Sequence, residues 1–193
     1  MPKPYYDSKL LEAGCDEVGR GCLVGPVVAG AVILPKNYKH PLLHDSKQLS
    51  PVKRGLLSKA IKQVAIAWAL GAASHQEIDQ LNVLQASYLA MHRAIALLNQ
   101  LPELLLIDGN RFKPYPHIPH VCIVKGDEQF NAIAAASIIA KTHRDAWMHD
   151  LAKKFPGYGW QTNVGYPTPS HCQAIEQLGI TPFHRKTFKM RRS

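Results

Sequence analysis

A buried strand near the start of the chain limits the folds open to this sequence more than any other feature. The apolar run VVAGAVIL, residues 27–34, is closed by Pro35. Its length and β-branched content predict a strand inside a sheet. The wider apolar stretch from Cys22 to Pro35 is broken by glycine and proline and is too short to span a bilayer. We therefore expect a globular protein built around this strand.

The remaining segments alternate between strand and helix patterns. Residues 10–17 predict a strand that enters a glycine-rich turn and forms a hairpin with residues 27–34. Ser50 and Pro51 predict the N-cap and first position of a helix that runs to about residue 62. The other predicted elements are strands over 64–70, 104–107 and 121–124 and helices over 82–99 and 132–146, the second rich in alanine. Together they predict a single α/β domain, residues 1–193, with early strands antiparallel and later strands alternating with helices.

Charge narrows the possible partners. The chain of 193 residues has 23 Lys and Arg against 14 Asp and Glu, a formal net charge of +9, which favours a polyanion such as nucleic acid. No basic amphipathic helix points to a membrane surface.

The first residues, MPKPYYDSKLLEAG, lack the apolar core of a signal peptide, so we expect a cytoplasmic protein. Four cysteines without CxxC spacing predict free thiols in the core, with neither a zinc site nor a disulfide framework.

Acidic residues follow several of the predicted strands. Asp16 and Glu17 end the first, Asp108 ends a later one and Asp127 lies just past the last. Each alone is equally explained as a solvated strand end, a turn or a helix cap. If they converge, each pair of carboxylates about 4 Å apart repels by about 4 kcal/mol, so a cation must share the site. Oxygen ligands suit Mg²⁺ or Mn²⁺, and such a cluster can hold two ions that clamp a phosphodiester.

The turn Gly19-Arg20-Gly21 comes directly after the first acidic pair. Neighbouring side chains on a regular strand point to opposite faces, so Asp16 and Glu17 share a site only if the chain bends there. Glycines permit that bend and let the backbone approach a sugar hydroxyl or a phosphate. The turn is equally explained as a connection between the strands of a hairpin.

Nine short sequence motifs are spread over most of the chain. They are CDEVGRG at 15–21, GPVVAGAVIL at 25–34, DSKQLS at 45–50, LLIDG at 105–109, VKGD at 124–127, AAASIIAKTHRD at 134–145, FPGYG at 155–159, NVGYPT at 163–168 and HRKTF at 184–188. In this order and spacing they resemble bacterial ribonuclease HII, the type 2 ribonuclease H family, over about residues 11–188.

The resemblance implies a fold and an activity. The fold would be ribonuclease H-like, a mixed sheet of about five strands flanked by helices with a C-terminal helical segment. The activity would be endonucleolytic cleavage of the RNA strand of RNA/DNA hybrids. It would also include incision 5′ to ribonucleotides embedded in duplex DNA, by two-metal-ion hydrolysis giving 3′-hydroxyl and 5′-phosphate ends.

The resemblance also assigns the site residues. The catalytic metal ligands for Mg²⁺ or Mn²⁺ would be Asp16, Glu17, Asp108 and Asp127, although Glu128 beside Asp127 leaves the orientation of that pair open. The turn Gly19, Arg20 and Gly21 would grip the 2′-hydroxyl and the neighbouring phosphate, the 2′-hydroxyl being the group that separates RNA from DNA. Tyr166 would pack on the sugar of the following deoxynucleotide.

For several further residues the sequence allows two roles, one in substrate binding and one in the structure. Lys47 either meets a phosphate or belongs to a turn, and Lys141 and Arg144 either steer the substrate or solvate one helix face. Ser137 is expected to be a small packing residue whose hydroxyl bonds the preceding turn. The basic segment 184–193 is either a duplex-contacting arm or a basic tail.

Other positions depart from the family pattern or lack a role. Cys22 stands where many family members have proline, which alters the stiffness of the loop. Asn163 and Val164 replace a frequent His-Lys pair, which predicts one phosphate contact fewer. His171 and His184 match family positions without a role that we can derive.

Two rival functions stay open. A non-catalytic hybrid-binding module would not place four acids beside phosphates. A type HIII-like ribonuclease would cleave hybrids without the junction preference, but that family has Lys where Arg20 stands and an extra amino-terminal domain, whereas about a dozen residues precede the first motif here. We expect a monomer, and recruitment to a replication clamp stays open.

Overall fold

The fold is a five-stranded mixed sheet flanked by helices, which confirms the predicted α/β class. The computed structural model describes residues 2–43 and 49–189. The strands are β1 (Glu12–Val18), β2 (Val27–Ile33), β3 (Ala67–Ala73), β4 (Leu104–Asp108) and β5 (His120–Ile123). Their order in the sheet is β3-β2-β1-β4-β5. The pairs β1/β2 and β2/β3 are antiparallel, whereas β1/β4 and β4/β5 are parallel.

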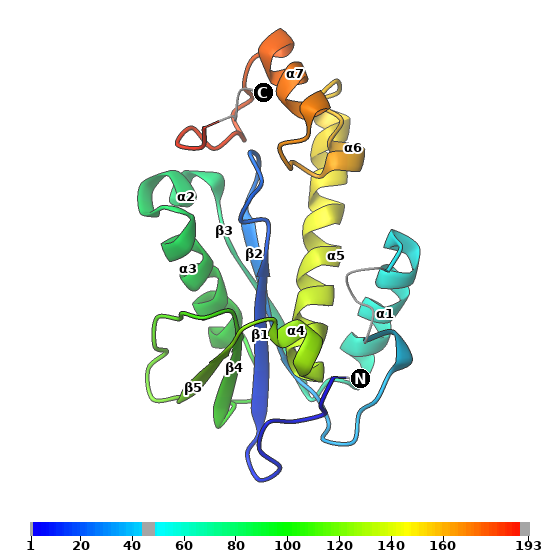
Figure 1. Ribbon diagram of the computed structural model, residues 1–193, viewed down its shortest axis with the longest axis vertical. Helices are drawn as coiled ribbons and strands as arrows, with labels where there is room; N and C mark the ends of the chain where they lie inside the picture. Colours follow the sequence, from blue (N-terminus) through cyan, green and yellow to red (C-terminus); the bar gives the residue numbers. More distant parts are fainter. Residues whose placement is uncertain (1, 44–48, 190–193) are drawn as a thin grey trace.

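Helices cover both faces of the sheet (Figure 1). The helical elements are the 3₁₀ turn η1 (Pro41–Leu43), α1 (Pro51–Val64), α2 (His75–Leu81), α3 (Val83–Ala96), α4 (Gly126–Gln129), α5 (Asn131–Lys154), α6 (Trp160–Asn163) and α7 (Pro169–Leu178). Helix α3 packs against β2 and β3, while α5 packs against β1 and β2 and carries α1 on its outer side. The sheet is thus the middle of three layers.

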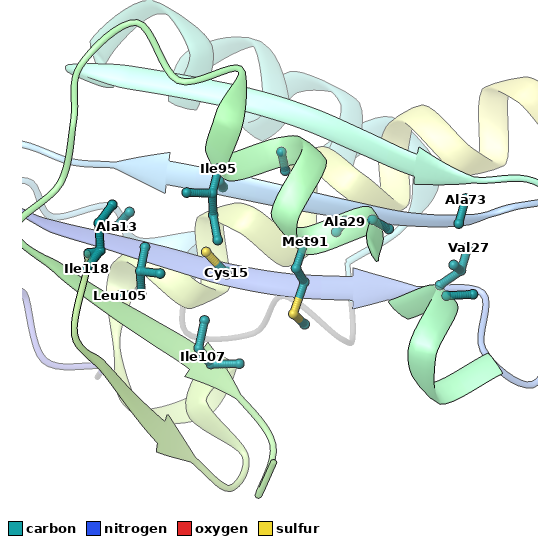
Figure 2. Packing of buried hydrophobic residues seen from close by; sticks show 14 of the residues in the cluster. Ala13, Cys15, Val27, Ala29, Ala73, Met91, Ile95, Leu105, Ile107 and Ile118 are labelled. Carbon is teal, nitrogen blue, oxygen red and sulfur yellow. The ribbon is translucent and has the colours of Figure 1, made fainter. Parts of the chain in front are cut away.

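Strand alternation divides the core between these layers. The side chains of Val27, Ala29 and other odd-numbered residues of β2 pack with α3, as Figure 2 shows for Met91 and Ile95 of that helix. Val32 points the other way, into the cluster that α5 and α1 form. Because neighbouring residues of a strand face opposite sides, β2 is buried on both.

Helix α5 lies unusually close to the sheet. A Cβ on Gly14 of β1 would come within 2.1 Å of the Ala132 backbone, and one on Gly30 of β2 within 2.5 Å of the Ala136 carbonyl oxygen. Neither helix nor strand leaves room for a side chain there. The alanine-rich start of α5 has the small side chains that such close packing needs, and this contact places the next turn of α5 over the end of β1.

The largest differences from the sequence prediction concern β3, α5 and α2. Strand β3 begins three residues later than expected because α1 continues to Val64. Helix α5 continues to Lys154 rather than residue 146, because its second half passes beyond the sheet and packs on α6. Helix α2 was not predicted, although the Ser74 and Glu77 capping box at its start is a recognisable signal.

The C-terminal segment builds a second hydrophobic cluster at one end of the molecule. Trp160 of α6 and Ile175 of α7 pack there against Met148 of α5. The segment after α7 turns back, and His184 and Arg185 are both 3% exposed. The expectation of a basic arm or tail is therefore wrong for these two residues, because their polar atoms face the interior; residues 190–193 lie outside the described part.

Among the described residues, no helix is both long and apolar enough to cross a membrane. Cytoplasmic localisation stays a prediction. The four cysteines are free thiols, as expected, although Cys122 and Cys172 are only partly buried.

Candidate active site

The sheet brings the four predicted acids to one place. Cys15 of β1 pairs with Ile107 of the parallel strand β4, so the residues that follow them, Asp16 and Asp108, lie side by side at the carboxyl ends of the two strands. Asp127 lies on α4, directly after β5. Together with Glu17, these three acids line a cavity of about 410 Å³. Asp127 is buried and Glu128 is exposed, which settles the orientation of that pair.

Burial and mutual repulsion disfavour the charged forms of the β1 acids. Burial raises the pKa of Asp16 well above its usual range, and the charges of Glu17, Asp108 and Asp127 raise it further. Burial also raises the pKa of Glu17 to about 6, although Arg20 opposes that rise through its charge and a hydrogen bond. A site that concentrates negative charge in this way favours any cation that enters it.

Hydrogen bonds orient these carboxylates. Asp108 Oδ1 accepts from the Gly126 amide at 2.7 Å, which ties β4 to the start of α4. Glu17 Oε1 accepts from Arg20 Nη1 at 3.1 Å. Asp16 Oδ1 accepts from the Glu17 amide at 2.7 Å, and the Ser137 hydroxyl of α5 opposes the rise of the Asp16 pKa. Ser137 is half-buried and lines the cavity, so it does more than the packing that the sequence predicted, because α5 lies directly over the end of β1.

The four carboxylates are the kind of ligand that a hard divalent cation prefers, but they are not arranged as a finished metal site. Within residues 2–43 and 49–189, no three His, Cys, Asp or Glu side chains are already arranged to hold a metal ion. Four neighbouring carboxylates repel one another, and a divalent cation bound among them would offset that repulsion. All the ligands on offer are carboxylate oxygens, which Mg²⁺ and Mn²⁺ accept and zinc sites seldom use alone.

The two glycines of the GRG turn meet different surroundings. Gly19 has φ +91°, and a Cβ there would lie 2.2 Å from Arg144 Nε, so the fold itself requires glycine. Gly21 has no positive φ, and its Cβ would meet only Tyr166 Cε1, at an ordinary 3.9 Å. The protein alone tolerates a larger residue at Gly21, so close approach to a ligand is the remaining reason for glycine there.

This contrast predicts two different mutant phenotypes. We expect Gly21→Ala to melt at the wild-type temperature yet to lose about 10- to 100-fold in the activity of this site, through displacement of a ligand bound against the turn. Gly19→Ala should lose about 1–3 kcal/mol of stability through backbone strain and overpacking. Gly55→Ala, in a helix with open space around it, is the matched control and should be fully active. Thermal melts and initial rates check this, and an active Gly21→Ala would contradict it.

Tyr166 stands at the rim of the same cavity, in a loop with a fixed backbone. Its side chain lines the cavity beside the acids and it is 39% exposed. Its carbonyl oxygen accepts from His171 Nδ1 at 2.8 Å, and Trp160 Nε1 donates to the other nitrogen of that ring at 2.9 Å. Asn163 is buried and accepts from the Gly165 amide at 2.8 Å. The loop is therefore built from residues whose roles the sequence left open, and both polar atoms of the Asn163 side chain bond the backbone of the loop itself.

Several basic residues around the cavity were assigned ambiguously or missed. Lys141 lines the cavity, donates to Asp145 at 2.8 Å and lies 5.6 Å from the Tyr166 ring centroid. Arg144, by contrast, is 1% exposed, so it neither steers substrate nor solvates the helix. Arg54 of α1 also lines the cavity and was not predicted. Lys47 lies outside the described residues.

Arg54 and Ser137 could have been found from weak signals. Ser137 is the one polar residue in the run from Ala132 to Ala140, which marks the face of the helix that meets the strand end. Arg54 falls on the helix that follows the DSKQLS motif, a stretch that the resemblance already placed near the site.

A sequence model of the family described as ribonuclease HII matches residues 13–191. This chain belongs to the ribonuclease HII family. Ribonuclease HII of Parabacteroides distasonis is 58% identical over 190 residues, which cover 98% of this chain and 96% of that protein. The family assignment makes the chain a ribonuclease, a hydrolase of phosphodiester bonds.

Solved structures agree with this assignment. The ribonuclease H2 from Pyrococcus horikoshii OT3 superposes with a TM-score of 0.77 at 26% identity, covering 93% of this chain and 94% of that one. Ribonuclease HII in the PCNA:RNase HII complex from Archaeoglobus fulgidus gives 0.75 at 25% identity, covering 95% and 98%. The ribonuclease H-like fold that the motifs implied is confirmed.

Proposed function

We propose that this protein is a divalent-metal-dependent endoribonuclease that cleaves the RNA strand of RNA/DNA hybrids. It also incises duplex DNA on the 5′ side of an embedded ribonucleotide, leaving 3′-hydroxyl and 5′-phosphate ends. The observation that carries the proposal is the shared cavity: four carboxylates and the ring of Tyr166 line it, directly beside the GRG turn. Phosphodiester chemistry and ribose recognition would thus occur within one site.

The acids would hold the catalytic cation. Asp16, Glu17, Asp108 and Asp127 are the ligands we propose for one or two Mg²⁺ or Mn²⁺ ions, which when bound supply positive charge to the phosphate and activate water. The Glu17 amide positions Asp16, and the Gly126 amide positions Asp108.

Basic groups around the acids would bind the phosphates. Arg20 is half exposed and pairs with Glu17 through a single contact, so its guanidinium can turn outward to a phosphate when that carboxylate binds a cation. Lys141, Lys125 and Arg54 line the same cavity and add positive charge on its walls. Attraction to phosphate there strengthens at low salt.

The ribose would be recognised from two sides. The backbone of the GRG turn would approach the 2′-hydroxyl, and Tyr166 would pack on the sugar of the next deoxynucleotide. Support comes from the closeness of Gly21 to the Tyr166 ring and from the steric freedom at Gly21. A deoxyribose offers no hydroxyl to the turn, which would separate RNA from DNA.

The family assignment weakens both rival functions. A type HIII-like activity has no specific support, because Arg20 stands in the turn and the ribonuclease HII model matches residues 13–191. A non-catalytic module would gain nothing from four acids beside phosphates. Recruitment to a replication clamp is also a proposal, supported by the PCNA complex of the archaeal homologue, and the monomeric state stays a prediction.

The first test of the proposal is cleavage of a long RNA/DNA hybrid labelled in the RNA strand. We expect internal cuts with Mg²⁺ or Mn²⁺ and none with chelator, because the carboxylates cannot approach a phosphate without a cation to offset their charge. Cleavage that persists in chelator would contradict the metal site. Binding of the hybrid without cleavage in either metal would favour the non-catalytic module.

A further inference from the structure

A buried arginine from the far end of the chain lies beneath the GRG turn. All three guanidinium nitrogens of Arg185 donate to backbone carbonyls of one loop. Nε donates to Gly25 at 3.0 Å, Nη1 to Arg20 at 2.8 Å and Nη2 to Gly19 at 2.7 Å. Arg185 is 3% exposed, so it cannot itself meet a phosphate. Its positive charge is dedicated to the backbone of the turn.

These bonds determine which way the peptide groups of the turn face. In a trans peptide the carbonyl and the N–H point in opposite directions, and the described residues contain no cis peptide. Since the carbonyls of Gly19 and Arg20 point at Arg185, the N–H groups of Arg20 and Gly21 point away from it, and both residues are exposed. Neither N–H has an acceptor among residues 2–43 and 49–189. Two backbone donors are therefore presented outward.

The segment that carries Arg185 is itself anchored. The Arg185 amide donates to the Leu23 carbonyl at 2.9 Å, and the Gly25 amide donates to the Phe183 carbonyl at 3.0 Å. The ring of Phe188 lies 4.9 Å from the centre of the guanidinium. Backbone bonds on one side and a ring on another hold the side chain in place, so it acts as a fixed support.

We propose that Arg185 is the positioning residue for ribonucleotide discrimination: it holds the amides of Arg20 and Gly21 in the orientation that meets the 2′-hydroxyl side of the substrate. The inference rests on the proposed function. A turn with glycine at both ends has large conformational freedom, and substrate would otherwise have to order it on binding. Arg185 holds the turn in one conformation before the substrate binds. The positions of the acids and of their cation do not depend on Arg185.

The test compares Arg185→Lys with the wild-type protein on two substrates, a duplex with one embedded ribonucleotide and a continuous hybrid. Lysine keeps the charge but cannot reach three carbonyls in fixed directions. We expect the ratio of kcat/KM for the embedded ribonucleotide to that for the hybrid to fall by about tenfold, with hybrid cleavage within about threefold of wild type. Backbone order parameters of residues 19–21 should fall from about 0.85 to below about 0.6.

Two further variants separate positioning from stability. Phe188→Leu removes the ring beside the guanidinium but none of its hydrogen bonds, so it should shift the ratio in the same direction by less; it also carries the test if Arg185→Lys does not fold. Ile95→Val removes one buried methyl group from α3 and no hydrogen bond of the turn, so it should weaken the core slightly and leave the ratio unchanged.

Equal losses on both substrates, or an unchanged ratio with a rigid turn, would overturn the role of Arg185. Cleavage by the wild-type protein distinguishes this result from a failure of the proposed function. If wild-type protein does not nick at the embedded ribonucleotide, the proposed function fails; if it does and Arg185→Lys discriminates equally well, only the positioning role fails.

Discussion

Asp108→Asn should reduce cleavage by roughly 10³-fold or more while leaving the fold intact. The Asn side-chain oxygen can still accept the hydrogen bond from the Gly126 amide, so the link between β4 and α4 survives. The variant would lose a charged group from the proposed cation site, and a bound cation contributes several kcal/mol to stabilising a phosphoryl transition state. Single-turnover cleavage of a hybrid at saturating Mg²⁺ measures the effect.

Stability should move in the opposite direction from activity. The charge of Asp108 is one of the causes that raise the pKa of Asp16, so its removal relieves repulsion in the metal-free protein. We expect the melting temperature without metal to be equal to wild type or higher. Asp150→Asn, which changes a surface carboxylate paired with Lys153, is the matched control and should be fully active. Normal turnover by a well-folded Asp108→Asn protein would rule out the metal site.

Tyr166→Ala should have the second-largest effect, and the effect should depend on the substrate. An aromatic contact with a nucleotide contributes about 1–3 kcal/mol, so cleavage at a single embedded ribonucleotide should fall by about 10- to 100-fold. Cleavage of a long hybrid should fall less, because only the isolated ribonucleotide depends wholly on sensing the junction. The loop should survive the change, because His171 holds its backbone through the residue 166 carbonyl.

Tyr166→Phe is the control for this prediction. It keeps the ring that would pack on the sugar and removes only the hydroxyl, so it should retain most activity on both substrates. Rates for the three proteins, measured under single-turnover conditions, separate the contribution of the ring from that of the hydroxyl. Equal losses by Tyr166→Ala on both substrates would contradict a role in recognising the junction.

The sheet, the main helices and the positions of the four acids followed from local sequence signals. Apolar runs such as residues 27–34 identify buried strands, and Ser50-Pro51 marks a helix start that the structure retains. Acids that directly follow parallel strands reach the same edge of a sheet, which is why Asp16 and Asp108 come together. These inferences need only neighbours in sequence and the geometry of a strand.

The buried arginines could not be predicted in the same way. Arg144 and Arg185 lie in basic stretches of sequence, and arginine is rarely buried, so both were assigned to the surface. In the structure each donates to three carbonyls of loops that no sheet or helix satisfies. Such acceptors appear only when loops distant in sequence meet, which local patterns do not encode.

The most direct test of the account is cleavage of an end-labelled DNA duplex that contains one ribonucleotide, with Mg²⁺, with Mn²⁺ and with chelator. The account predicts a metal-dependent nick immediately 5′ to the ribonucleotide, and no cut in a duplex that is deoxyribose throughout. Cutting of a continuous RNA/DNA hybrid without a nick at the single ribonucleotide would contradict it. That result would leave Arg20 and Tyr166 without the roles proposed here and would favour a type HIII-like activity.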